Sequence, residues 1–102
     1  MTEAAAEADL DEALRALAHA ERRVFVRECL DRECAAGELA EISSLAIASV
    51  SEHLKVLRKT GLLTLEVRGR FWMYRTDPAR LQQVLAALQG SFELERENDH
   101  GT

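Results

Sequence analysis

Two cysteines and three histidines are the side chains of this sequence best suited to bind a metal ion or react with an oxidant. They are Cys29, Cys34, His19, His53 and His100. Zinc sites draw such residues from short, repeated spacings, and no pair here has a recognised zinc spacing. We therefore expect neither a metal site nor another cofactor.

The two thiols leave one chemistry open, a soft-metal or thiol-redox sensor built from Cys29 and Cys34 within one chain or across two. A helical separation of five residues would place the two side chains more than one turn apart, which argues against it. The default role of Cys29, four residues after Phe25, is a small buried side chain. Without a signal peptide, we expect reduced thiols rather than a structural disulfide.

A second group of side chains could bind phosphate. Residues 46–76 carry six basic and two acidic side chains, a net charge of +4, although the whole chain carries −5. Residues 1–45 carry five basic and eleven acidic side chains, and residues 77–102 carry two and five. An acidic body with one basic stretch would confine attraction for nucleic acid to that stretch. Uneven charge is also common in small domains, so charge alone assigns no partner.

Motifs of catalysis are missing from the sequence. It has no glycine-rich phosphate loop, no nucleophile elbow and no HExxH, and its paired carboxylates fall on polar helix faces. We therefore do not expect an enzyme. No apolar run approaches the ~18 residues needed to cross a bilayer, and the N-terminus is acidic where a signal peptide would be basic. We expect a cytoplasmic protein without a membrane partner.

The start of the basic stretch has the pattern of a helix-turn-helix. Leu39 and Ile42 suit a short helix over about 37–43, and Ser43-Ser44 interrupts the apolar run. A second helix is predicted from about 46 to 59. Its apolar stripe contains Ile47, Val50, Leu54 and Leu57, and its opposite side contains Ala48, Ser49, Glu52, Lys55 and Lys59. Such an outer face suits a DNA groove, but an ordinary amphipathic surface helix has the same spacing.

A short β-hairpin is predicted after this helix. Gly61 can adopt the left-handed conformation that ends the helix. The alternating runs LLTLEV and RFWMYR follow, separated by Arg68-Gly69. With Arg68 and Gly69 as the turn, the predicted cross-strand neighbours are Leu63, Leu65 and Val67 opposite Tyr74, Trp72 and Arg70.

These segments together resemble the ArsR/SmtB family of small dimeric winged-helix transcriptional repressors. The resemblance covers roughly residues 10–88, through ALAHAERRVFVREC, GELAE, SVSEHLKVLRKTGLL and GRFWMYR. It implies a mainly α fold, a winged helix-turn-helix with five helices and a two-stranded wing. It also implies a homodimer on an inverted-repeat DNA operator, with helix 46–59 in the major groove and the turn at 68–70 beside the backbone.

The candidate DNA-binding residues follow from this placement. Serines donate to phosphates or bases, and Lys and Arg supply electrostatic contacts. Glu52 could accept from a cytosine amino group or could simply be tolerated near phosphate. His53 matches the second of two histidines often found here in the family. The full set is Ser49, Ser51, Glu52, His53, Lys55, Arg58, Lys59, Arg68 and Arg70.

The chain departs from the family at two helix starts. Where Gly-Leu-Ser-Gln is common, it has Ser44-Leu45-Ala46-Ile47, without the capping serine and the glutamine that could read a base. This departure motivates an alternative, a winged-helix protein-interaction module that no longer binds DNA. The helix over about 19–32 starts at Ala18-His19-Ala20-Glu21, which is a weaker cap than the family's Ala-Asp-Pro-Thr. Its basic pair, Arg22 and Arg23, either approaches phosphates or is solvated.

The first and last helices carry the candidates for the dimer interface. Asp77-Pro78 is a helix start, with Asp as the cap and Pro in the first turn. The resemblance implies that the two helices pack together across the dimer axis, although a single-chain core would also use their apolar faces. The candidates are Leu10, Leu14, Leu17, Leu81, Val84, Leu85, Leu88 and Phe92.

The chain length of 102 residues fits one domain. We expect a flexible N-terminus over 1–8, the winged helix-turn-helix over 9–92 and a polar tail over 93–102. The resemblance also raises release from DNA by a ligand, a soft metal or thiol oxidation. The family's thiol pair would fall near Ala35 and Gly37, which cannot coordinate a metal, and no histidine lies between Asp77 and Asn98 to complete the ligand set of the last helix.

Overall fold

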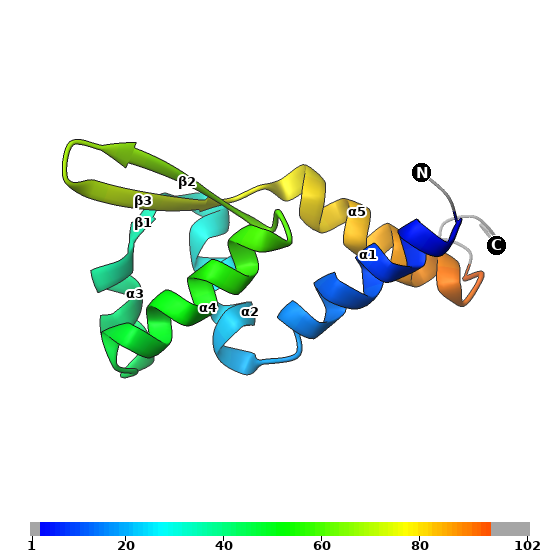
Figure 1. The fold of residues 1–102 in the computed structure, drawn as a ribbon, viewed down its shortest axis with the longest axis horizontal. Coiled ribbons are helices and arrows are strands. Elements are labelled where there is room, and N and C mark those ends of the chain that lie inside the picture. The colour runs from blue at the N-terminus through cyan, green and yellow to red at the C-terminus, as the bar shows by residue number, and fades with distance from the viewer. Residues whose placement is uncertain (1–2, 95–102) are drawn as a thin grey trace, which may run out of the picture.

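The computed structural model describes residues 3–94, which form five helices and a small three-stranded sheet (Figure 1). The predicted winged helix-turn-helix is confirmed. The elements in chain order are α1 (Glu3–Ala16), α2 (Ala20–Asp31), β1 (Cys34–Ala35), α3 (Ala36–Ser43), α4 (Ile47–Lys59), β2 (Leu63–Arg68), β3 (Phe71–Thr76) and α5 (Pro78–Ser91).

Helices α3 and α4 form the helix-turn-helix, and each ends in a residue with positive φ. Ser44, with φ +61°, ends α3 and donates its N–H to the carbonyl of Ala40. Gly61, with φ +80°, ends α4 as predicted. There the N–H of Leu62 donates to Leu57 O at 3.1 Å, the long bond of a Schellman motif. The N-cap of α4 is Ala46 and offers no side-chain bond, so the weak start that the sequence indicated is confirmed.

The wing is an antiparallel hairpin of β2 and β3, and its predicted register is wrong by one residue at the turn. Arg68 pairs with Phe71, so Gly69 and Arg70 form the turn. A two-residue hairpin turn of type I′ or II′ needs positive φ at its first central position. Gly69, with φ +61°, adopts it more easily than Arg68 would. Relative to the prediction, the partner of each β2 residue lies two positions further along β3. A shift of two residues keeps each side chain on its predicted face of the sheet.

A third strand was not predicted. β1 pairs with β3 through Cys34 opposite Tyr74 and Ala35 opposite Met73, giving the sheet order β1-β3-β2. Two residues are too few to show strand alternation in a sequence. The N–H of Ala35 donates to Glu38 Oε1 at 2.7 Å, and this bond is the main cause of a lowered pKa of Glu38. β1 therefore ties the start of α3 to the wing.

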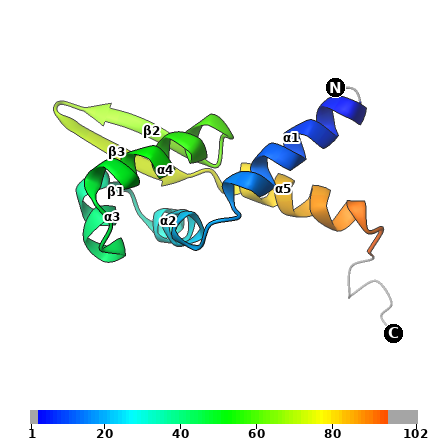
Figure 2. The same cartoon turned by 60° about the horizontal axis from the view of Figure 1, so that its bottom comes forward.

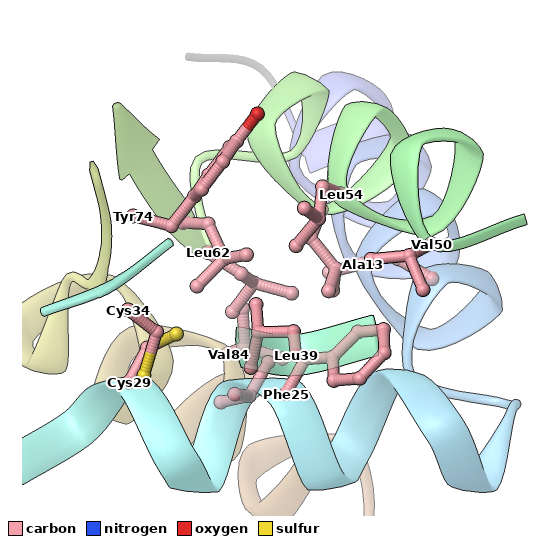
Figure 3. Packing of buried hydrophobic residues seen from close by; sticks show 14 residues of the cluster. Ala13, Phe25, Cys29, Cys34, Leu39, Val50, Leu54, Leu62, Tyr74 and Val84 are labelled. Atoms are coloured by element: carbon pink, nitrogen blue, oxygen red, sulfur yellow. The ribbon is translucent and has the colours of Figure 1, made fainter. Parts of the chain in front are cut away.

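The core lies between α2, α4 and the inner face of the sheet (Figure 3). The Thr76 hydroxyl, itself buried, donates to the carbonyl of Val26 at 2.7 Å and joins β3 to α2. The buried apolar side chains are Ala13, Ala16, Phe25, Val26, Cys29, Cys34, Leu39, Val50, Leu54, Leu57, Leu62, Leu63, Tyr74 and Val84.

One member of the predicted α4 stripe is not in this core. Val50, Leu54 and Leu57 are buried as predicted, but Ile47 is 54% exposed. Ile47 lies in the first turn of α4, and Val50, one turn later, is the first α4 residue in the buried cluster. The start of α4 therefore extends beyond the core, which leaves Ile47 exposed. Ile42 of α3 is similarly 49% exposed.

Helices α1 and α5 pack against each other and form an arm that projects from the rest of the molecule (Figure 1). Figure 2 shows the two helices diverging toward their outer ends. The radius of gyration is 15.5 Å, compared with about 13 Å for a compact domain of this length. Asp77 caps α5 as predicted, since its Oδ1 accepts from the N–H groups of Ala79 and Arg80.

The predicted interface residues of this arm divide into two groups. Val84 is buried within the chain, so its assignment to a dimer interface is corrected to the protomer's own core. Leu85 and Phe92 are 53% and 66% exposed. Leu10, Leu14, Leu17, Leu81 and Leu88 are half-buried. On α1 it is alanines, at 13 and 16, that reach the core.

Arg80 joins the arm to the helix-turn-helix. Its Nε donates to the carbonyl of Thr60 at 2.8 Å, at the end of α4, and its Nη2 lies 2.9 Å from Asp9 Oδ1 of α1. Its Nη1 donates to Gln83 within α5. One guanidinium therefore fixes the relative positions of three helices.

The expected domain boundaries stay predictions. α1 begins at Glu3, inside the segment expected to be flexible, and residues 3–8 are exposed. Most of the expected tail, residues 95–102, lies outside the described residues. None of the helices within residues 3–94 combines the length and apolar character needed to cross a membrane.

Candidate nucleic-acid interface

The outer face of α4 is open to solvent along its whole length. The side chains predicted there are all exposed, as are two further α4 candidates: Ala48, Ser49, Ser51, Glu52, Lys55, Arg58 and Lys59. Among residues 3–94, no carboxylate lies within ion-pair distance of the two lysines or of Arg58. This face therefore offers to a polyanion three cations without an ion-pair partner and two hydroxyls, together with the carboxylate of Glu52.

An open groove of about 440 Å³ separates α4 from the wing. Ser51, Lys55 and Arg58 form its helix side, and Trp72 and Tyr74 form its strand side. A groove with cations along one wall and aromatic rings along the other can hold a phosphate-sugar strand.

Trp72 is a candidate that sequence analysis missed. The alternating pattern places it on the inner face of the hairpin, where burial is expected, yet it is 53% exposed. Its cross-strand neighbour Val67 is also 53% exposed. The wing extends past the core, so inner-face residues near its tip lose their cover. The sequence did contain a signal for this candidate, because Trp72 is the single tryptophan of the chain and lies in the basic stretch over residues 46–76.

The two arginines predicted at the wing tip differ in their partners. Arg68 is hydrogen-bonded and ion-paired to Glu33, which precedes β1, and its Nε lies 3.4 Å from Glu66 Oε2. The bond to Glu33 is the main cause of a raised pKa of Arg68. Arg70, in the turn, is exposed and has no such partner within residues 3–94. At the tip, Arg70 is therefore the more available cation.

His53 lies at the side of α4 that packs against α2, away from the lysines. Its Nδ1 accepts a hydrogen bond from Arg22 Nε at 3.0 Å, and its ring centroid lies 6.2 Å from that of Phe25. Burial first, and then the charge of Arg22, lower the pKa of His53. A neutral imidazole that accepts from Arg22 holds the two helices together. The other member of the basic pair, Arg23, donates to the carbonyl of Leu17 at 2.6 Å.

The two thiols lie together in the core, where Figure 3 shows their sulfur atoms adjacent. The helical-spacing argument against their proximity is wrong, because α2 ends at Asp31 and Cys34 returns to it in β1. Burial, and secondly the neighbouring Cys34, raise the pKa of Cys29 to about 12, and burial raises the pKa of Cys34. Both thiols are therefore protonated at neutral pH and unreactive while buried.

No group of three or more His, Cys, Asp or Glu side chains within residues 3–94 is placed to hold a metal ion.

An exposed polar helix in a helix-turn-helix, followed by a hairpin wing, defines a winged-helix protein of the DNA-binding type. Residues 17–66 match the family model described as a helix-turn-helix domain. The chain is 37% identical over 71 residues to the HTH-type transcriptional regulator Rv2034 of Mycobacterium tuberculosis. That match covers 70% of this chain and 66%, just under two thirds, of the relative.

Solved structures that resemble this chain are also structures of transcriptional regulators. A possible transcriptional regulator for arsenical resistance has a TM-score of 0.72 and 34% identity, over 82% of this chain and 86% of that chain. An ArsR-like transcriptional regulator from Rhodococcus sp. RHA1 has a TM-score of 0.75 and 25% identity, over 83% and 80%. This chain belongs to the ArsR family of helix-turn-helix transcriptional regulators. The family and the fold are those of transcription regulators, not of enzymes.

Proposed function

We propose that this protein is a cytoplasmic transcriptional repressor that binds an inverted-repeat DNA operator as a homodimer. The observation that carries the proposal is the exposed face of α4 with its uncompensated cations, continuous with the groove to the wing. α4 would enter the major groove, and Lys55, Arg58 and Lys59 would contact phosphates on its edges. One DNA strand beside the major groove would lie in the protein's groove between α4 and the wing, with Arg70 at the far side of that DNA strand.

The homodimer in this proposal rests on the arm of α1 and α5. An apolar groove of about 250 Å³ opens beside it, and the apolar side chains along this groove are Leu17, Val26, Leu30, Leu81 and Leu85. A second copy is the proposed occupant, because the arm projects from the rest of the protomer and leaves Leu85 and Phe92 53% and 66% exposed. A structural neighbour supports this choice. The winged helix-turn-helix domain Mb0332 from Mycobacterium bovis is a homodimer, with a TM-score of 0.74 and 20% identity over 93% of this chain and 92% of that chain.

The charge distribution suits a protein that must release DNA as well as bind it. Outside residues 46–76 the chain is strongly acidic. Acidic surroundings disfavour DNA contacts outside that stretch, and phosphate contacts made by its cations make the affinity fall with salt.

The direct test is a titration with duplex DNA from upstream of the protein's own coding sequence at several salt concentrations. The logarithm of affinity should fall linearly with that of salt, and Lys55→Ala should flatten the slope by about one unit. Arg75→Ala is the matched control, since Arg75 is exposed on β3 but faces away from the groove that its neighbour Tyr74 lines. Affinity that is indifferent to salt would contradict the proposal.

A protein-interaction module is the second candidate, and the apolar tip of the wing favours it. Val67, Phe71 and Trp72 are 53%, 61% and 53% exposed. Exposed apolar side chains at this density can mark a protein interface. The same titration separates the two candidates, because Lys55→Ala would then leave the affinity for any duplex unchanged.

A further inference from the structure

The first turn of α4 presents apolar side chains where a recognition helix would meet base edges. Ile47, the first residue of α4, is 54% exposed, and Ala48 after it is also exposed. The N-cap, Ala46, offers no hydrogen-bonding side chain either. The first side chain of α4 that can donate or accept a hydrogen bond is therefore Ser49.

Ile47 lies where the buried stripe of α4, which continues at Leu54, meets the side of the helix that lines the groove. Residues four and eleven positions apart on a helix share one side, which places Ile47 in line with Ser51 and Arg58. Both of these line the groove between α4 and the wing. A duplex held by Arg58 and Lys55 would therefore bring its base edges to Ile47 at the start of the helix, where helix-turn-helix proteins read sequence.

The chemistry of the major groove leaves Ile47 one partner. Adenine, guanine and cytosine present donors and acceptors there, which an aliphatic side chain cannot bond, whereas thymine also presents its C5-methyl group. We infer that Ile47 reads a thymine in each half-site through van der Waals contact with that methyl group. This inference rests on the proposed function and adds to it the base that the helix selects.

The expected effect follows from burying one methyl group. Burial of a CH₂-sized group is equivalent to about fourfold in affinity. Removing the methyl group from the contacted thymine should therefore weaken binding about fourfold in one half-site and roughly sixteenfold in both, if the half-sites act independently.

The experiment uses the full chain and the duplex that it binds best from a randomised-sequence library. Each thymine of that duplex is replaced in turn by deoxyuridine, which lacks only the C5-methyl group, and affinity is measured by fluorescence anisotropy. We expect one symmetric pair of positions to show the loss with the parent protein. Ile47→Ala should bind the parent duplex more weakly and should no longer distinguish deoxyuridine from thymidine at that pair.

Ile42→Ala is the matched control, because Ile42 is an isoleucine of similar exposure on the supporting helix α3. It should retain the full sensitivity to deoxyuridine, and both variants should melt like the parent. If no deoxyuridine weakens salt-dependent binding, or if Ile47→Ala keeps the same sensitivity, the inference is overturned and the proposed function stands. If no duplex is selected and binding does not respond to salt, the proposed function itself fails.

Discussion

The two ends of this molecule expose different chemistry. At the end formed by α4 and the wing, exposed cations lie among exposed apolar side chains such as Ile47 and Trp72. At the other end, the arm exposes Leu85, Phe92 and Leu94 at 53%, 66% and 62%. The first surface matches a charged polymer, and its binding should weaken with salt. The second matches an apolar partner, and its association should depend little on salt.

The largest expected effect comes from breaking the arm end. Leu85→Asp places a charge in the proposed dimer interface, where an unpaired buried charge costs several kcal/mol. The variant should be a monomer by sedimentation, and its operator affinity should fall by roughly a hundredfold or more, because one half-site gives half the contacts. Val24→Asp changes an apolar side chain that is 42% exposed on α2 and should leave the dimer intact. A dimeric Leu85→Asp protein would remove the arm from the proposed interface.

The next effect comes from uncoupling the two ends at Arg80. Arg80→Met keeps the apolar stem but removes the bonds to Thr60 and Asp9. A hydrogen bond from a charged group contributes about 1.5–3 kcal/mol, and the pair with Asp9 adds little because the Asp9 side chain is 45% exposed. We therefore expect the free energy of unfolding to fall by about 2 kcal/mol in urea. Arg75→Ala, an exposed change, should stay within about 0.5 kcal/mol of the parent. Equal stabilities would show that Arg80 does not hold the arm.

A smaller effect compares the two arginines at the tip of the wing. Arg70→Ala should lower operator affinity and flatten the salt slope by about one unit. Arg68→Ala should flatten it less, because Glu33 and Glu66 already neutralise Arg68. Glu33→Gln releases Arg68 from one carboxylate and should raise the affinity. Identical slopes for the two alanine variants would show that DNA displaces the carboxylates at no cost.

The smallest effect at neutral pH concerns the thiols, which lie in the core and belong to neither exposed surface. The pKa of Cys29 is raised from 9.0 to about 12 in the folded protein, so folding favours the protonated thiol. Stability should be unaffected by this group below pH 9 and should fall between about pH 9 and 12. At pH 7 a thiol reagent should react slowly, and an oxidant should leave the parent and the Cys29→Ser, Cys34→Ser double variant bound to DNA to the same extent. Selective release of the parent would instead establish a thiol sensor.

Much of the end formed by α4 and the wing could be predicted because its signals are local. The spacing of Val50, Leu54 and Leu57 predicted both the buried and the exposed face of α4. Asp77-Pro78 predicted the start of α5, because a side-chain cap and a fixed φ act within one turn. The separation of charge along the sequence also located the basic surface.

Other features of the same end could not be predicted, because distant residues decide them. The inward position of His53 depends on Arg22, thirty-one residues away. The pairing of Arg68 depends on Glu33, thirty-five residues away. The exposure of Ile47 and Trp72 depends on where the core ends, which periodicity does not report.

By itself, the sequence determined the helices, the hairpin, the family and the polarity of α4, since helix periodicity, caps and turn residues act over a few positions. Tertiary structure alone decided which cations stay uncompensated, which arm side chains the protomer buries and that Cys29 and Cys34 lie together in the core. These outcomes depend on contacts between segments far apart in the chain. The free energy of each such contact includes desolvation and pairing terms that exist only once the segments have packed.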